Sequence, residues 1–385
     1  MNAPDVVQTA HDLIPLAAAS APASERESSL AAEVVAGIAE ADLFRLCVPR
    51  SVGGHEAGAG EIVGAIEALS QGDGAAGWCL MIAATAGLVS GWLARASAAE
   101  VFGRPDAPCG GVFAPRGRAE PDSSGYRVTG RWPFSSGVRH SAWMLGGCVV
   151  HERSGPRLLP SGAPDVHLLV WPRAELEIVE TWSVTGLRGT GSHDMQLDGM
   201  LVPSALAVSL FTGAPVEDGP LYAFPIFGLL AVGVAAVGLG IARAALDDLT
   251  ALAGAKTPSM STRPLADHPS AQATAAGACA QVSAARAFLY EAVEEAWAEA
   301  VQARAVTLER RARLRLAATH AAAASAAAVA AVYHAAGGSS IYTTSPLERR
   351  FRDVHTLRQH MIVGPATLEL AGRVLLGARI DATML

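Results

Sequence analysis

The chain has few charged or aromatic residues, and its acidic side chains outnumber the basic ones. Charged residues make up 17% and aromatic residues 5% of the 385 positions, and the formal net charge is -7. Nucleic-acid binding requires clustered Lys and Arg to neutralise phosphates, so this balance argues against such a partner. Apolar residues make up 51% of the chain, enough to bury a large core in one domain or in two to three smaller ones.

The chain also lacks paired cysteines and an export signal. Its five cysteines are odd in number and widely spaced, and no pair has the spacing of a metal-binding motif. The N-terminal residues contain no basic stretch followed by an apolar run. These absences predict reduced, mostly buried thiols, no metal site and a cytoplasmic location. The cysteines are Cys47, Cys79, Cys109, Cys148 and Cys279.

One long uncharged run, Ala223–Ala242, has the length of a membrane span. Its 20 residues are enough for a spanning helix. The run stands alone, contains four glycines and lacks basic flanks and an aromatic belt. A helix buried on all sides at the centre of a bundle has the same composition. We predict such a helix and no membrane, with a membrane span as the less favoured alternative.

Residue patterns divide the chain into three parts. Residues 1–105 and 216–385 carry apolar residues at helical spacing, whereas residues 106–215 carry short β-type runs separated by Gly, Pro, Asp and Ser. The prediction is an α+β fold with an N-terminal helical domain, a central β-barrel or sheet domain and a C-terminal four-helix bundle. The predicted helices are a run opened by Ser24, then Glu61–Ser70, Gly74–Leu93, Ala223–Leu252, Pro269–Ala303, Leu308–Ala336 and Pro365–Ala378. The predicted strands lie within 125–134, 143–152, 165–172, 176–182 and 193–203.

The stretch Tyr333–His360 is the most distinctive part of the chain. The alanine-rich helix before it is predicted to stop at Gly337-Gly338, and Pro346 is predicted to begin a second helix. Four arginines and two histidines follow within twelve residues. Such a cluster can form a binding site or a solvated helix face, and its composition alone leaves both open.

Two stretches of the β region carry residues suited to contact a planar ligand. Gly130–Gly137 (GRWPFSSG) places a Trp, a Phe and two hydroxyls at a strand end, where they could wall and hydrogen-bond a heteroaromatic ring. A strand with a core Trp and a serine turn has the same sequence. Glu180–Ser192 (ETWSVTGLRGTGS) combines three glycines with hydroxyls in a tight connection. It is not a dinucleotide fingerprint, because the spacing differs and no helix follows.

These stretches, in this order, resemble the acyl-CoA dehydrogenase superfamily over nearly the whole chain. LFRLCVPRSVGGHEAG is similar to that family's N-terminal helix-to-loop passage, and GRWPFSSG to the strand beside its flavin ring. ETWSVTGLRGTGS and AAGGSSIYTTSPLERRFRD are similar to two further family motifs. The resemblance implies a homotetramer built as a dimer of dimers. It also implies a flavin between sheet and bundle, partly covered by a neighbouring subunit.

The superfamily contains two branches that differ in one catalytic group. The dehydrogenases use a carboxylate to remove a proton from an acyl-CoA. One family position for this base falls in Arg358–Ile362 and the other in Tyr222–Leu246, and neither segment contains an acid. The chain therefore resembles the other branch, the two-component flavin-dependent monooxygenases. These enzymes take reduced flavin, FMNH2 or FADH2, from a separate flavin reductase and form a C4a-hydroperoxide with O2.

In that branch a histidine on the last helix follows the Arg-Asp pair by seven residues, the spacing of His360 from Asp353. Ser136 matches the serine of the branch's Trp-x-Phe-x-Ser-Gly strand. The resemblance implies that His360 and Ser136 are catalytic and hydrogen-bond the distal peroxide oxygen in a dry pocket. A structural role is the alternative for His360. The implied flavin contacts are Trp132, Phe134, Ser135, Ser136, Gly337, Gly338, Ser339 and His360, with Gly110–Ala114 beside the ring. Arg263 resembles the arginine that reaches the flavin phosphate or pyrophosphate of a neighbouring subunit, with an exposed loop arginine as the alternative.

The implied substrate is a small organic molecule, aromatic or a secondary metabolite. Aromatic hydroxylases of this branch often carry a second histidine eight residues after a Gly-Trp pair, where this chain has Ala86. Without that base, a simple phenol is less expected than an amine, an indole, a sulfur heterocycle, a polyketide or a carrier-bound acyl group. His140 is a further candidate lining residue, with a surface histidine as the alternative.

Two other functions stay open from the sequence. A dehydrogenase or oxidase could act on a thioester through an unrecognised base. Glu291, Glu294 and Glu295 form an acidic cluster, although an exposed helix face explains them more simply. A catalytically silent member could instead serve as an assembly or binding subunit.

Overall fold

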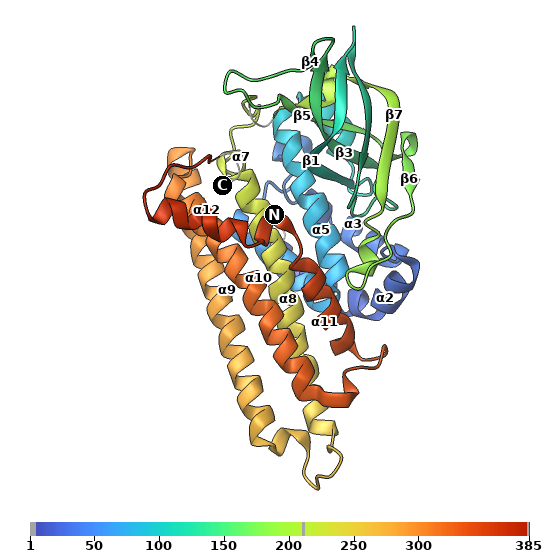
Figure 1. Ribbon diagram of the computed structural model, residues 1–385. Helices are drawn as coiled ribbons and strands as arrows, with labels where there is room; N and C mark the ends of the chain where they lie inside the picture. The colour runs from blue at the N-terminus through green and yellow to red at the C-terminus, as the bar shows by residue number, and fades with distance from the viewer. Residues whose placement is uncertain (1–4, 210–211, 383–384) are drawn as a thin grey trace.

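The computed structural model describes residues 5–209, 212–382 and 385, in which a sheet stands above a group of long helices (Figure 1). The order of helices, sheet and helices confirms the predicted α+β class. The α-helices are α1 (Val6–Asp12), α2 (Ile14–Glu27), α3 (Ala32–Glu40), α4 (Ala59–Gly72), α5 (Gly74–Ala86), α6 (Arg95–Phe102), α7 (Pro220–Ala223), α8 (Ile226–Ala255), α9 (Pro269–Ala303), α10 (Leu308–Ala336), α11 (Pro346–Leu357) and α12 (Ala366–Leu375). The strands are β1 (Cys109–Pro121), β2 (Gly125–Trp132), β3 (Trp143–Glu152), β4 (Gly155–Pro156), β5 (Val166–Pro172), β6 (Glu177–Val179), β7 (Asp194–Pro203) and β8 (Ala207–Val208).

The helix predicted to open at Ser24 is in fact two helices. α2 ends at Glu27 and α3 begins at Ala32, with Ser28 between them in a left-handed conformation (φ 47°). Ser24 lies in the last turn of α2, and its hydroxyl accepts a hydrogen bond from the Ala31 N–H at 3.0 Å. The serine was predicted to cap a helix start, and it instead ties the end of one helix to the next.

The sheet has eight strands in the order β6-β7-β2-β1-β3-β5-β8, with β4 paired to β3. The sequence predicted five of these strands but not β1, the longest. β1 is rich in Gly, Pro and charge, which lowers its local strand propensity, and it is held by pairing with β2 on one side and β3 on the other. Among the described strands, no pairing joins β6 to β8, so the sheet stays open and does not close into a barrel.

Trp132 lies inside this sheet domain, away from any surface. Its side chain is fully buried, its ring lies 5.1 Å from that of Trp171, and its Nε1–H donates to the Gly147 carbonyl at 2.8 Å. Glycines on adjacent strands make room for the indole. A Cβ added at Gly117 would come within 2.2 Å of the ring, and one added at Gly146 within 2.8 Å. The predicted flavin contact is therefore corrected to a core residue.

The C-terminal helices form a bundle around α8. α8 packs against α10, α4 and α11, and α9 lies against α10 on the outside. The predicted bounds of α9 and α10 are both confirmed. The five cysteines are free and all but Cys279 are buried.

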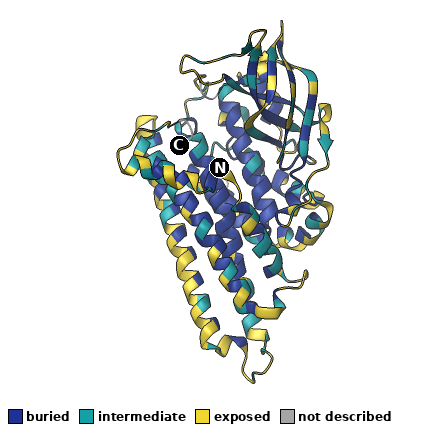
Figure 2. Ribbon diagram, viewed as in Figure 1, coloured by how far each residue is buried: buried dark blue, intermediate teal, exposed yellow. Residues whose placement is uncertain are grey.

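Three helical stretches are long and apolar enough to cross a membrane by length and composition, namely Gly74–Trp92, Ile226–Ala255 and Leu308–Ser339. Within the fold, 94%, 83% and 61% of their most apolar windows are buried. Figure 2 shows this burial along α5 and α8, whereas the outer face of α9 is exposed. The burial of α8 fits the predicted central bundle helix.

Candidate active site

His360 lies in a tight turn just after α11, and not on the helix as predicted. α11 ends at Leu357, and His360 precedes a short 3-10 turn, Met361–Val363. Its Nδ1 accepts a hydrogen bond from the Ile362 N–H at 3.3 Å. A neutral imidazole whose Nδ1 is an acceptor carries its proton on Nε2. The turn therefore leaves His360 one N–H to donate to a ligand.

The surroundings of His360 keep its imidazole uncharged. Desolvation by the surrounding protein and, to a lesser extent, the nearby Arg315 guanidinium lower the pKa of His360 to about 4. Arg315 is buried and donates from Nη2 to the Ile362 carbonyl at 3.1 Å, which anchors the turn from within the bundle. His360 itself is exposed, so a ligand can reach its ring. At neutral pH it can donate a hydrogen bond but is not a charged acid.

Trp78 on α5 brings the two predicted catalytic residues to one place. Its ring lies 5.6 Å from the His360 ring in an edge-on arrangement, with 64° between the planes. Its Nε1–H donates to the Ser136 hydroxyl at 2.9 Å. Ser136 in turn is bonded to the Ser192 hydroxyl at 2.7 Å. The sequence had used Trp78 only as a reference point for Ala86, and its place beside His360 was not predicted.

Phe134 and Trp182 form an exposed aromatic pair beside this cluster. Their ring centroids are 6.2 Å apart at 89°, and Phe134 is 69% exposed. Phe134 has a φ of +65°, a conformation that costs a non-glycine residue about 1–3 kcal/mol. Hydrogen bonds from the Ser136 N–H to the Phe134 carbonyl and from the Ser135 N–H to the His193 carbonyl hold it there. The pair leaves aromatic surface open to solvent, and a flavin contact at Phe134 stays a prediction.

The Trp182 indole is fixed from two directions. Its Nε1–H donates to the Leu187 carbonyl at 3.2 Å. Its backbone N–H and that of Thr181 both donate to the Nδ1 of His193, at 3.1 and 3.2 Å. These bonds make Trp182 a rigid wall, and neither Trp182 nor His193 was predicted as a site residue.

Several predicted lining groups face elsewhere. The Ser135 hydroxyl is buried and donates to the Trp132 carbonyl at 2.9 Å, so it points into the sheet. The His140 ring packs against its own turn, because a Cβ at Gly137 would lie 2.9 Å from its Nε2. Burial lowers the pKa of His140 to about 4. Gly110 lies against the same turn, and a Cβ added to it would come within 3.1 Å of the Ser136 carbonyl.

The remaining predicted cofactor residues lie at the other end of α11 from His360. Gly337–Ser339 end α10, with Gly337 in a positive-φ conformation (59°), and Arg263 is exposed in the loop between α8 and α9. The 12 residues of α11 rise about 18 Å. One chain therefore does not place Arg263 and His360 against the same part of a flavin.

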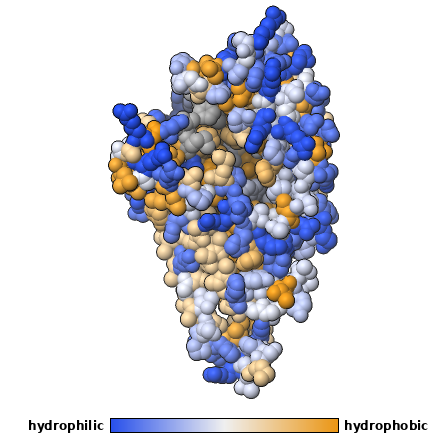
Figure 3. Space-filling model, in the orientation of Figure 1, coloured by the Kyte–Doolittle hydropathy of each residue, from blue (hydrophilic) through white to orange (hydrophobic). Residues whose placement is uncertain are grey.

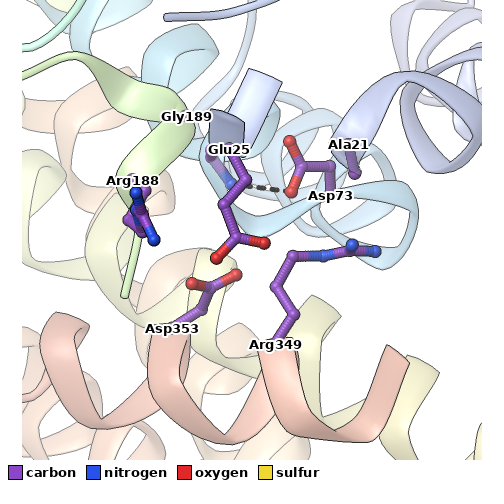
Figure 4. Close-up of a pocket in the computed structure, with 8 residues that line it drawn as sticks. Ala21, Glu25, Asp73, Arg188, Gly189, Arg349 and Asp353 are labelled. Carbon is purple, nitrogen blue, oxygen red and sulfur yellow. Dashed lines mark hydrogen bonds between the residues drawn. The ribbon is translucent and has the colours of Figure 1, made fainter. Parts of the chain in front are cut away.

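A buried carboxyl pair lies where α5, α11 and the 186–192 segment meet (Figure 4). Asp353 accepts a hydrogen bond from the Leu187 N–H at 2.6 Å. Desolvation and the charge of Asp73 raise the pKa of Asp353 to about 7, and desolvation also raises the pKa of Asp73. The adjoining cavity of about 10 Å³ has room for roughly one water molecule and is too small for a flavin. The pair is thus an anchor for the 186–192 segment.

Known proteins match this arrangement of elements and site. The family description "Acyl-CoA dehydrogenase, C-terminal domain" matches residues 232–365. Indole-3-acetate monooxygenase of Pseudomonas putida is 34% identical over 359 residues, covering 92% of this chain and 89% of that protein. The chain belongs to the flavin-dependent monooxygenases of the acyl-CoA dehydrogenase superfamily.

Other relatives of this monooxygenase agree on cofactor and organisation. The oxygenase subunit HsaA, a flavin-dependent monooxygenase of Rhodococcus jostii, is 27% identical, with 85% of this chain and 86% of that protein covered. The structure of XiaF from Streptomyces sp., in complex with FADH2 and glycerol, has a TM-score of 0.90 and 25% identity, with 98% and 96% of the two chains covered. The monooxygenase uses reduced flavin and O2, as predicted.

The alternative of a thioester dehydrogenase or oxidase is not supported in this monooxygenase. Glu291 and Glu295 form surface ion pairs with Arg313 and Arg310, which is the exposed helix face that the sequence favoured. The named relatives are monooxygenases, not acyl-CoA dehydrogenases. Flavin-dependent monooxygenation is the function that the comparisons establish.

Proposed function

We propose that this monooxygenase oxidises an indole-type ring, with His360 as the hydrogen-bond donor to the reacting oxygen. The carrying observation is that the Trp78 indole lies beside His360, whereas Ala86, farther along the same helix, is an alanine buried in the sheet-side core and provides no base. Thr85, adjacent to Ala86 in sequence, donates its hydroxyl to the Met81 carbonyl at 2.7 Å. A phenol gains reactivity by losing its proton to a base, whereas an indole is electron-rich without deprotonation.

The chain's own groups would hold and shield the reacting centre. Reduced flavin, when bound, supplies the electrons that activate O2. Phe134 and Trp182 would offer aromatic surface to a planar ring, His360 would donate from Nε2–H to the oxygen, and Trp78 would cover one side of the imidazole. A separate flavin reductase would deliver the reduced flavin, in line with a relative named as an oxygenase subunit. We place both proteins in the cytoplasm.

Indole-3-acetate is the first substrate to test, because a 34%-identical relative is named for it. With a flavin reductase present, we expect oxygen uptake to be coupled to an oxidised indole product. The matched control is 4-hydroxyphenylacetate, which keeps the acetate group and replaces the indole by a phenol. We expect coupled turnover of the phenol to be about tenfold lower than that of the indole, which corresponds to about 1.4 kcal/mol in the activation free energy. Hydroxylation of the phenol with no reaction of the indole would contradict the proposal.

We also propose that the chain assembles into a homotetramer, a dimer of dimers. Ile341 and Tyr342, in the loop between α10 and α11, are 63% and 65% exposed and lie close in sequence to Gly337–Ser339. Figure 3 shows apolar side chains gathered over the face of α10. A second copy covering these surfaces would bring the Arg263 end of one chain to the flavin of another.

Light scattering should give a mass four times that of the 39.5-kDa chain. Tyr342→Glu is expected to shift the particle to half that mass or less, since a buried charge disrupts an apolar interface. Asp198→Asn, an exposed position on β7 in the sheet, serves as the control and should leave the tetramer intact. A wild-type protein that is monomeric at micromolar concentration would rule the assembly out.

A further inference from the structure

A chain of buried hydroxyls runs behind Trp78. The Trp78 Nε1–H donates to the Ser136 Oγ at 2.9 Å, Ser136 and Ser192 are 2.7 Å apart, and Ser192 and Thr190 are also 2.7 Å apart. Thr190 reaches the Leu187 carbonyl at 2.8 Å. The three hydroxyl residues are 4%, 3% and 1% exposed, so water does not compete for these bonds.

The groups at the two ends of this chain of hydroxyls determine which partner donates in each hydrogen bond. A carbonyl oxygen only accepts, so Thr190 gives its single proton to Leu187. Ser192 must then donate to Thr190, and Ser136 must donate to Ser192. Ser136 is left to accept from Trp78, whose indole N–H only donates. In this arrangement Ser136 has no proton for the cleft, contrary to the expected role of its hydroxyl as a donor to the oxygen.

Both ends of this chain of hydroxyls, Leu187 and Trp78, contact α11 or the turn that follows it. Leu187 holds a left-handed conformation (φ 52°), and its N–H donates to the buried Asp353 carboxyl at 2.6 Å. Seven residues later, His360 lies against the Trp78 ring. The segment from Asp353 to His360 thus contacts the hydroxyl chain at both ends, through Asp353 at Leu187 and through His360 at Trp78.

We infer that Thr190 and Ser192 are positioning residues of the monooxygenase reaction, which lock the Trp78 indole against His360 and turn the Ser136 proton away from the cleft. This rests on the proposed role of His360. The chain sets one orientation of Trp78, since rotation of the indole would leave a buried N–H and three hydroxyls to find new partners. The Nε2–H of His360 is then the donor that this pair presents to the oxygen.

The test removes one hydroxyl without changing the shape of the side chain. Thr190→Val keeps the branched shape and lacks the hydroxyl, whereas Thr190→Ser keeps the hydroxyl. With reduced flavin and O2 but no substrate, we expect Thr190→Val to release hydrogen peroxide about three- to tenfold faster than wild type, equivalent to one ordinary buried hydrogen bond. Thr190→Ser should stay within about twofold of the wild-type rate. Equal rates for Thr190→Val and wild type would overturn the inference.

A double-mutant cycle with Trp78→Phe separates positioning from general destabilisation. Phe lacks the indole N–H, so Thr190→Val should add nothing to the peroxide release of Trp78→Phe, although both changes lower the melting temperature. In the protein without flavin, the near-ultraviolet circular dichroism assigned to Trp78 should weaken in Thr190→Val and persist in Thr190→Ser. An equal acceleration with and without the indole N–H would show that Thr190 serves stability alone.

Peroxide release from His360→Ala and Thr190→Val distinguishes a failure of this inference from a failure of the proposed function. If His360→Ala accelerates peroxide release and Thr190→Val does not, only the positioning role is lost. If His360→Ala itself has no effect, the proposed role of His360 fails first.

Discussion

Replacing His360 by Ala should accelerate the release of hydrogen peroxide at least tenfold when reduced flavin and O2 are supplied without substrate. The variant lacks the imidazole N–H that His360 can donate to a ligand, while the backbone bonds of the turn, Val363 N–H to His360 and Gly364 N–H to Met361, remain. A hydrogen bond to developing negative charge is worth about 1.5–3 kcal/mol, and 1.4 kcal/mol corresponds to tenfold in rate. Stopped-flow mixing with a peroxide-specific dye measures the rate directly.

The control is His360→Gln, which offers an N–H at similar reach. We expect it to recover part of the lost peroxide retention, whereas His360→Phe should behave as His360→Ala. Oxidised-flavin affinity, followed by flavin fluorescence, should change little in all three variants, because Phe134 and Trp182 provide the aromatic contact. If peroxide release is unchanged while flavin binding is lost, His360 is a binding residue and the proposed role is wrong.

Trp132→Ala should lower the free energy of unfolding by about 3–5 kcal/mol, the range for removing a large aromatic side chain from a core. Trp132 is fully buried between strands, packs on Trp171 and donates to the Gly147 carbonyl. The change leaves a cavity and an unpaired carbonyl in the sheet. Chemical denaturation followed by fluorescence, with and without flavin, measures the loss.

Trp132→Phe is the matched control and should cost less, because most of the apolar volume stays. Its affinity for flavin is expected to equal that of the wild type. The opposite pattern, weaker flavin binding with unchanged stability, would mean that Trp132 does line the cofactor cleft, as the sequence suggested.

The helices could be predicted from the sequence because residues at their ends favour helix starts and stops. α9 begins at Pro269, a favourable first helical residue, and α10 ends at Ala336, just before Gly337, whose positive φ suits glycine. Both bounds were therefore predicted to the residue. β1 has no such signal, because its Gly- and Pro-rich sequence becomes a strand only through pairing with β2 and β3. The break at Ser28 likewise depends on a hydrogen bond between two helices.

The active site was predictable in part for the same reason. His360 and Ser136 stand in recognisable motifs, but Trp78 joins them only because α5 packs between the sheet and the turn after α11. Ser135 and Ser136 are neighbours with the same chemistry, yet one hydroxyl points into the sheet and the other to Trp78. Phe134, just before the two serines, has a left-handed backbone conformation, and no local sequence pattern predicts that conformation.

The central claim is that an uncharged His360 donates a hydrogen bond in the flavin cleft. Its most direct test is the ratio of peroxide-release rates, His360→Ala over wild type, from pH 6 to pH 9. Because the pKa of His360 is lowered to about 4, its uncharged form predominates throughout this window, and only near pH 4 would protonation remove the Nδ1 acceptor and place a charge on the ring. Both proteins also carry Asp353→Asn, because Asp353 has a pKa raised to about 7 and holds Leu187 at the far end of the hydroxyl chain that positions Trp78. We predict a ratio of at least ten that does not vary with pH. A ratio near one, or one that changes with a midpoint near 6.5, would contradict the account.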